Sequence, residues 1–265
     1  MTIVTYKNKK VYPIIFPSQY SGMGSINCYI LQNGEDYTLL DAGIDTPDFQ
    51  QFFMTKLSQF KIEPKQINRM VLTHFHADHT GMVNVLTANH HIPVYASRLA
   101  IDRLKFDINY LQQKMKFYEE TYEQYGVLHF ANERMEKLRE TLQNRKQLQI
   151  RSEIFPLKEE IAGLQILKTP GHSPDSISLY DDETGWLFAG DFIIETGMTS
   201  ALLEQDEQGE MVLSLQQYIE SFDIVQQLRI KQVFAGHKNM FQNVEEVIQN
   251  CKRKIDYKLA KVIKK

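Results

Sequence analysis

The chain has 265 residues, enough to bury a core as one large domain or two small ones. Hydrophobic residues make up 43% and charged residues 24%, as in ordinary globular proteins. The formal net charge is −3, so no overall electrostatic field attracts the chain to nucleic acid or to an anionic membrane. Charge alone therefore does not determine the partner; the motifs that follow make a small-molecule substrate the expectation and nucleic acid a poor candidate.

Cysteine content and apolar runs bear on the cellular compartment. The two cysteines, Cys28 and Cys251, are too few to form a disulfide scaffold, and a low count is typical of a reducing compartment. The first ten residues lack the apolar core of a signal peptide, and no later stretch approaches the ~18 uninterrupted apolar residues of a membrane span. We therefore expect a cytoplasmic protein without a membrane span.

The first part of the chain is predicted to form a β-meander followed by alternating helices and strands. Asn33-Gly34 is a strong hairpin signal. Phenylalanine and leucine recur at helical spacing over 46–60, which predicts a helix that covers the sheet. The predicted strands are 3–7, 11–16, 26–32, 36–41, 67–72 and about 93–96, with a second helix over about 79–88.

Residues 73–81 read Thr-His-Phe-His-Ala-Asp-His-Thr-Gly and join a buried strand to a helix. Three of the eight histidines of the chain fall within six positions here, beside an aspartate. Imidazole nitrogen and carboxylate oxygen are the ligands that borderline divalent metals prefer. A loop can direct several such groups to one point, so we expect metal ligands at His74, His76, Asp78 and His79.

Four further candidates stand at strand ends or in rigid turns: Asp41, His172 after Thr-Pro-Gly, Asp191 after Phe-Ala-Gly and His237 after Ala-Gly. The last three are predicted metal ligands. Asp41 is predicted to accept a hydrogen bond from the second ring nitrogen of a ligand histidine, with a turn-forming role as the alternative. His90 and His91 are interpreted as solvated loop residues.

Residues 98–150 are predicted to form a helical hairpin with a break at Gly126. Its ten basic and eight acidic residues indicate a mixed, solvated surface rather than a nucleic-acid patch. Two roles remain open. The hairpin is either a packing or homodimer element, or a lid whose Met115, Tyr118 and Tyr122 line an apolar substrate pocket.

The second half returns to strands and ends in helices. The strands at 154–155, 164–167, 177–180 and 186–189 are predicted to form another meander, followed by a helix at 214–228, a strand at 231–235 and a helix at 243–263. Seven basic residues follow position 251. We interpret them as opposing the negative end of the terminal helix dipole, with a membrane or RNA contact as the alternative.

In this order, the motifs resemble those of the metallo-β-lactamase superfamily over nearly the whole chain. The resemblance implies an α/β protein in which residues 1–265 form one domain, a four-layer αβ/βα sandwich with the helical insertion at 98–150. The metals would lie at one edge of the two sheets. It also implies that His74, His76 and His172 bind a first metal, that Asp78, His79 and His237 bind a second, and that Asp191 bridges them.

The complete ligand set looks like that of the glyoxalase-II, lactonase and ribonuclease-Z branches, whereas the commonest class B lactamases have a cysteine in place of Asp191. The near-neutral charge does not supply the basic surface that the ribonuclease-Z branch needs for RNA. It implies two divalent ions, zinc before manganese or iron, and a hydrolase that uses a metal-bound hydroxide. Asp78 would carry the proton to the leaving group. The expected substrate is an ester, lactone or thioester. The alternatives are a phosphodiesterase or nuclease-like hydrolase, an iron-dependent persulfide-type oxidoreductase, and a metal-stabilised scaffold.

Overall fold

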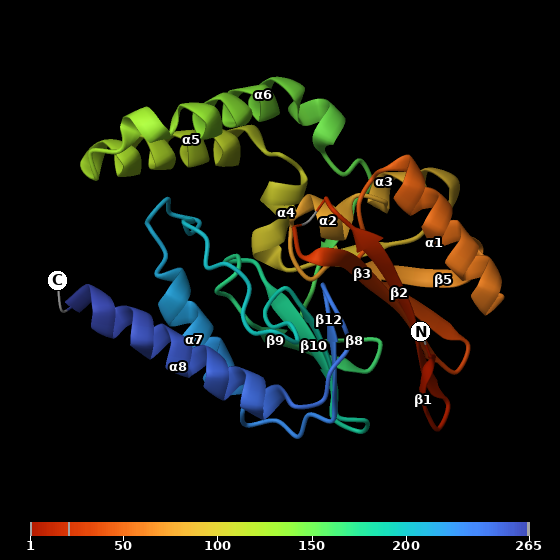
Figure 1. The fold of residues 1–265 in the computed structure, drawn as a ribbon. Coiled ribbons are helices and arrows are strands. Elements are labelled where there is room, and N and C mark those ends of the chain that lie inside the picture. The colour runs from red at the N-terminus through yellow and green to blue at the C-terminus, as the bar shows by residue number, and fades with distance from the viewer. Residues whose placement is uncertain (1, 21, 264–265) are drawn as a thin grey trace.

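The computed structural model describes residues 2–20 and 22–263, which form two β-sheets packed face to face with helices outside (Figure 1). The first sheet has the order β1 (Val4–Tyr6), β2 (Lys9–Ser18), β3 (Gly24–Asn33), β4 (Asp36–Leu40), β5 (Ile67–Val71), β6 (Val94–Ala96) and β7 (Ile154–Pro156). Its first four strands pair antiparallel, and β4 to β7 pair in parallel.

The second sheet is mainly antiparallel. It has the order β12 (Gln232–Ala235), β11 (Trp186–Gly190), β10 (Ile177–Asp181), β9 (Leu164–Lys168) and β8 (Glu160–Ile161), and only β11 and β12 pair in parallel. Within the described part of the chain, no helix is both long enough and apolar enough to span a bilayer.

Three buried apolar clusters fill the spaces between the layers. One lies between the sheets and joins residues such as Tyr29 and Val71 of the first sheet to Phe188 and Phe234 of the second. The first sheet packs its other face on helices α1 (Pro47–Phe60) and α3 (Val83–Asn89). The second sheet packs on α7 (Ser214–Val225) and α8 (Val244–Ile263). The predicted four-layer sandwich is therefore confirmed.

The helix predicted over about 79–88 is two helices, α2 (Ala77–Thr80) and α3, separated at Gly81. The amides of Gly81 and Met82 donate to the carbonyls of Gly43 and Ala42 instead of continuing the helix. A Cβ on Gly81 would lie 2.2 Å from the backbone nitrogen of Asp45. This close approach holds the metal-ligand loop against the end of β4.

The local pattern predicted that the strand near 154 belongs to the second meander, and this prediction is wrong. Ile154 pairs in parallel with Val94 of β6, so β7 forms the last strand of the first sheet. The insertion therefore leaves the first sheet after β6 and returns to the same edge at β7. Local apolar patterning carries no information about which sheet a strand joins.

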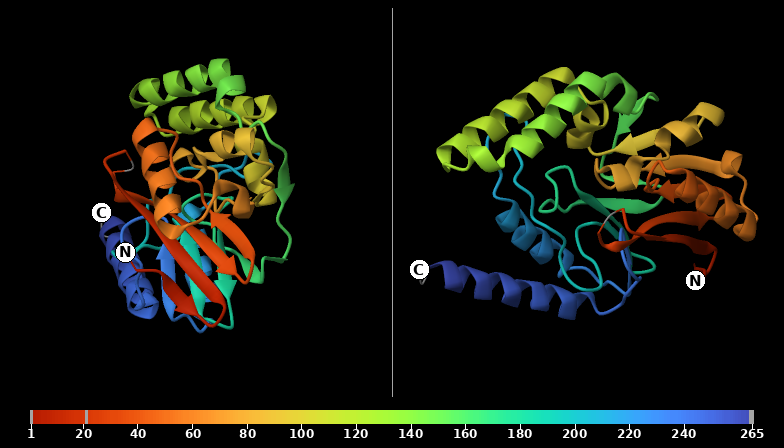
Figure 2. Two further views of the ribbon diagram at one scale, coloured as in Figure 1. Left: turned by 90° about the vertical axis from the view of Figure 1, so that its right-hand side faces the viewer. Right: turned by 45° about the horizontal axis from the view of Figure 1, so that its top comes forward.

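The insertion contains α4 (Arg98–Leu104), α5 (Ile108–Gln124) and α6 (Asn132–Leu148). In both views of Figure 2, α5 and α6 lie side by side, on the opposite side of the sheets from α8. The apolar spacing had suggested that α4 and α5 are continuous. Instead, Asp107 begins a new helix by accepting hydrogen bonds from the amides of Asn109 and Tyr110.

Candidate metal centre

Five histidines and two aspartates converge between the ends of the two sheets. His74, His76, Asp78 and His79 come from the loop and helix after β5, whereas His172, Asp191 and His237 follow β9, β11 and β12. They form three groups in which the nitrogen or oxygen atoms lie within 4.8 Å of one another. These groups are His74 with His76 and His172, His74 with His79 and Asp191, and Asp78 with His79 and His237.

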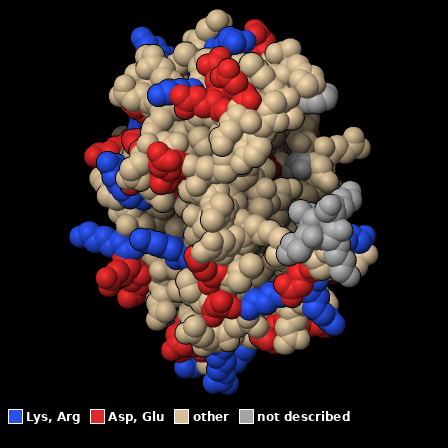
Figure 3. All heavy atoms as spheres, turned by 90° about the vertical axis from the view of Figure 1, so that its left-hand side faces the viewer, with Lys and Arg blue, Asp and Glu red and all other residues tan. Residues whose placement is uncertain are grey.

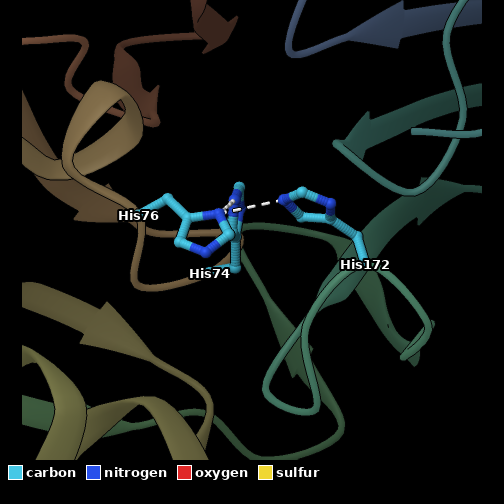
Figure 4. A group of neighbouring side chains, drawn as sticks. All are labelled: His74, His76 and His172. Atoms are coloured by element: carbon cyan, nitrogen blue, oxygen red, sulfur yellow. Dashed lines mark hydrogen bonds between the residues drawn. The ribbon is translucent and has the colours of Figure 1, made fainter. Parts of the chain in front are cut away.

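The first group brings three imidazole rings to one point (Figure 4). His76 Nδ1 lies 3.0 Å from His74 Nε2 and 2.9 Å from His172 Nε2. His74 and His76 come from the first sheet and His172 from the second, so this point lies on the seam between the sheets. A neutral ring nitrogen either donates or accepts a hydrogen bond. The other contacts of each ring therefore determine which of these three nitrogens carries a proton.

The outer nitrogens of His74 and His172 fix their tautomers. Thr73 Oγ1 donates to Asp41 Oδ2 and so accepts from His74 Nδ1, at 3.1 Å. His172 Nδ1 lies 3.0 Å from the Ser200 carbonyl oxygen, which can only accept. Both Nε2 atoms therefore carry lone pairs that face His76, and its single Nδ1 proton could satisfy only one of them well. Converging lone pairs are the arrangement that a cation requires.

The same logic applies to the second group. His79 Nδ1 lies 2.8 Å from Asp41 Oδ2, and His237 Nδ1 lies 2.5 Å from the Ser25 carbonyl oxygen. Each nitrogen donates outward, so each Nε2 presents a lone pair to the centre. His237 Nε2 is 3.1 Å from Asp191 Oδ2, and two electron-rich atoms at this distance repel unless a proton or a metal ion lies between them.

Two buried atoms of the centre lack a hydrogen-bond partner among the described residues: His79 Nε2 and Asp191 Oδ1. They lie 3.2 Å apart, and their residues are 0% and 6% exposed. Leaving such groups buried and unsatisfied costs about 1–3 kcal/mol each. Coordination to a divalent ion would satisfy both, so the residues present fit a metal centre.

Electrostatics favour positive charge here. Burial alone would raise the pKa of Asp191, but the neighbouring histidines, His79 first, hold it well below its usual value. Burial would lower the pKa of His79, yet Asp191 and Asp41 outweigh this effect and raise it well above the ordinary value, so without an ion a proton occupies the Nε2 position that a metal would take. For His76, burial and the His172 charge lower the pKa to about 3, so its ring is neutral at neutral pH, as a ligand must be.

Two glycines let the ligand-bearing strands approach. Gly190 has a φ of +50°, and a Cβ there would lie 2.6 Å from Thr73 Oγ1. A Cβ on Gly236 would lie 2.4 Å from Asp191 Oδ1 and 2.6 Å from His79 Cε1. The amide of Gly236 also donates to the Gly190 carbonyl at 2.8 Å. Space therefore requires a glycine in each strand-end motif, and at Gly190 the backbone conformation requires it as well.

A buried charged network supports the loop from the side of the insertion. Phe75, between the candidate ligands His74 and His76, lies within cation–π distance of Arg103 and Lys114. Lys114 donates to Glu204 Oε1 at 3.0 Å, and both side chains are buried. Burial would lower the pKa of Lys114, but the neighbouring Tyr110 and Glu204 raise it, so the ammonium stays charged. This network connects α4 and α5 with the segment that follows Asp191.

The three residues predicted to line a substrate pocket, Met115, Tyr118 and Tyr122, pack in one small cluster of the insertion. Tyr118 is fully buried, stacks on Tyr122 and donates from its hydroxyl to the Leu203 carbonyl. Met115 and Tyr122 pack on the same small cluster. None of the three lines the cavities described below. Of the loop histidines, His90 is half-buried and His91 exposed, and neither joins a metal group.

Sequence reasoning missed the residues that orient the ligands. Thr73, Thr199 and the Ser25 carbonyl each contact the outer nitrogen of a candidate ligand histidine. Thr73 precedes the first histidine and could have been noticed as a hydroxyl beside a ligand. Ser25 and Thr199 had no signal, because their place is set by the fold of distant segments. Both cysteines are buried and free.

Asp41 offers a direct test of this support. It is 4% exposed, has a φ of 59° and accepts from the Thr73 amide as well as from His79. We expect Asp41→Asn to lower metal affinity by about 10–100-fold, because the amide cannot accept every one of these hydrogen bonds and leaves His79 poorly oriented. Competition with a fluorescent zinc chelator would measure the change. An unaltered affinity would show that Asp41 acts only in the turn.

Comparison with known proteins agrees with this geometry. Residues 21–237 match the family model described as the Metallo-beta-lactamase superfamily. The probable metallo-hydrolase YqjP of Bacillus subtilis is 24% identical over 243 residues, covering 90% of this chain and 75% of the relative. The chain belongs to the metallo-β-lactamase superfamily and is an enzyme of its metallo-hydrolase class.

Two further relatives and one solved structure extend the comparison. The atrochrysone carboxyl ACP thioesterase of Aspergillus fumigatus is 23% identical over 233 residues, covering 88% of this chain and 56% of the relative. The beta-lactamase-like protein 2 homolog of Caenorhabditis elegans is 23% identical over 252 residues, covering 94% of this chain and 68% of the relative. The metallo-beta-lactamase family protein TTHA1429 of Thermus thermophilus superimposes with a TM-score of 0.71 at 21% identity, covering 94% of this chain and 80% of that structure.

Proposed function

We propose that this protein hydrolyses an ester, lactone or thioester at a centre of two divalent metal ions. The observation that supports it best is the convergence of five histidines and two aspartates, with the outer nitrogens of four histidines already bonded to other groups. His74, His76 and His172 would hold one ion, and Asp78, His79 and His237 the other. Asp191 would contact both.

The chain's own residues define what the centre can do. Bound divalent ions would activate a water molecule and polarise the oxygen of the bond to be cleaved. The Asp191 side chain is almost fully buried and would supply negative charge to the bound ions, whereas the Asp78 side chain is 24% exposed. Asp78 can therefore exchange protons with water and with a leaving group, which makes it the proposed proton carrier.

Acyl substrates are favoured by the surroundings of the centre. A cavity of about 400 Å³ borders His76 and Phe75, with Leu104, Phe106 and Ile150 of the insertion on its wall. An apolar wall beside a metal ligand suits an acyl chain better than a sugar-phosphate backbone. The similarity to a protein named a thioesterase supports the same class. We propose zinc as the metal, although a structural relative, TTHA1623, is known in a di-iron form.

Metal analysis combined with a substrate screen tests this function. We expect about two zinc ions per chain by elemental analysis, cleavage of p-nitrophenyl octanoate or octanoyl thioesters, loss of activity with a chelator and recovery with zinc. The control is bis(p-nitrophenyl) phosphate, which we expect to be cleaved poorly. One iron per chain without hydrolysis would favour a redox enzyme instead, and cleavage of the phosphodiester alone would favour a nuclease-like function.

A further inference from the structure

A second cavity, of about 620 Å³, lies on the side of the metal centre that is formed by the second sheet. Four segments enclose it: the β2–β3 connection, the segment after Asp191 and the helices α7 and α8. Its volume falls within the range of ~300–1,000 Å³ that is usual for small-molecule sites. It is larger than the cavity beside His76.

This cavity adjoins the metal centre through shared residues. Thr199 and Ser200 line it, and the same two residues contact the outer nitrogen of His172 at 2.8 and 3.0 Å. Thr199 Oγ1 also donates to the Asp191 carbonyl. The segment that bounds the cavity therefore orients two candidate metal ligands. The cavity therefore lies beside His172, on the side of its outer nitrogen.

The walls are apolar and the rim is basic. Uncharged side chains form most of the lining: Met23, Met198, Ala201, Leu215, Cys251, Ile255 and Leu259. Burial raises the pKa of the Cys251 thiol, so this wall stays uncharged at neutral pH. Lys254 and Lys258 are the charged side chains in the described lining. Figure 3 shows the side toward which α8 ends, where the centre of the face is largely uncharged and charged side chains lie above it, below it and to its left.

The two lysines are placed to act together. They stand four residues apart on α8, so their Cβ atoms are about 5–6 Å apart on one face of the helix. Both are exposed, and neither has an ion pair among residues 2–20 and 22–263, whereas Lys252 on the same helix pairs with Asp223. Two unpaired ammonium groups at the mouth of an apolar cavity favour an anion at that position. Lys264 and Lys265 of the basic run lie outside the described residues.

We propose that this cavity is the specificity subsite of the enzyme, and that it selects substrates whose apolar body ends in a carboxylate or a phosphate held by Lys254 and Lys258. This inference rests on the proposed function for the cleavage itself. The apolar walls hold the chain, and the lysines bind the anion at the end remote from the cleaved bond. The basic residues of α8 thus have a role beyond the helix dipole.

Matched substrates test the subsite. We would compare p-nitrophenyl octanoate with the mono-p-nitrophenyl ester of octanedioic acid, which adds a carboxylate to the acyl chain. Octanoyl-N-acetylcysteamine and octanoyl-coenzyme A form a second pair, in which phosphates are added to the leaving group. We expect one anionic member to have a KM about tenfold lower than its neutral partner, equivalent to ~1.4 kcal/mol. The pair that shows the preference identifies which side of the bond enters the cavity.

Variants of α8 separate charge from packing. Lys254→Gln/Lys258→Gln is expected to abolish the anionic preference by raising KM, with kcat and the neutral substrates unchanged, and Lys254→Arg/Lys258→Arg is expected to retain it. Lys261→Gln, on the same helix but outside the lining, is the control. Equal KM values for both members of both pairs, or a preference that survives the double Gln variant, would overturn the proposal.

Direct binding distinguishes failure of the subsite from failure of the function. Calorimetry of the purified protein with octanedioate and with coenzyme A requires no cleavage. Binding that weakens about tenfold in the double Gln variant would support the subsite even if no ester were hydrolysed. Absence of binding by both probes, together with hydrolysis of neutral esters, would refute the subsite and leave the hydrolase intact.

Discussion

Asp191→Ala is expected to reduce bound metal from about two ions per chain to one or none and to lower kcat/KM by at least about 10³-fold, the scale seen when a group that stabilises developing charge is removed. The carboxylate lies 3.2 Å from His79 Nε2 and 3.1 Å from His237 Nε2. Its loss leaves the lone pairs of these rings without the negative charge that would hold an ion among them. Elemental analysis and initial rates on an ester measure the two effects.

The fold should survive this change. Removing Asp191 also removes a buried charge, so far-ultraviolet circular dichroism is expected to match that of the parent protein. Asp102→Ala, at an exposed carboxylate of α4, is the matched control and should alter neither metal content nor rate. Full metal occupancy with an unchanged rate in Asp191→Ala would remove the proposed mechanism.

Gly236→Ala is expected to have the second largest effect, although it adds only a methyl group and touches no substrate. The new Cβ would lie 2.4 Å from Asp191 Oδ1 and 2.6 Å from His79 Cε1, so both side chains must shift. Overpacking of this kind costs about 1–3 kcal/mol of stability. Because the displaced groups are candidate ligands, we also expect metal affinity to fall by at least about tenfold.

Gly34→Ala is the control that separates a loss of stability from a loss of metal affinity. Gly34 has a φ of +63°, and a Cβ there meets nothing within 4 Å, so the substitution strains the backbone far from the centre. It should lower the melting temperature but leave the metal content intact. If Gly236→Ala bound metal as tightly as the Gly34→Ala protein, the tight packing around Asp191 would not control the centre.

The candidate ligands could be proposed from the sequence because the signals for them are local. Each candidate ligand follows a strand or turn that the residues beside it specify, such as the apolar run before His74 or the Gly before Asp191. The matching motifs then indicated the family and its sandwich. The break between α2 and α3 was hidden, since it depends on the carbonyls of Ala42 and Gly43, some 40 residues earlier.

The substrate side was less predictable. Tyrosines at helical spacing in the insertion suggested a pocket, but periodicity does not show which partner a face meets. Tyr118 meets the Leu203 carbonyl instead. The larger cavity joins Met23, Thr199 and Leu259, which no sequence pattern connects. Placing β7 in the first sheet likewise depended on long-range pairing.

The first metal group draws His74 and His76 from one sheet and His172 from the other. An ion held there would link the two sheets at one edge of the sandwich. A ligand that binds only the folded state stabilises it by ~2.7 kcal/mol at a free concentration of a hundred times its Kd. Metal binding would therefore contribute to the stability of the folded enzyme as well as to its activity.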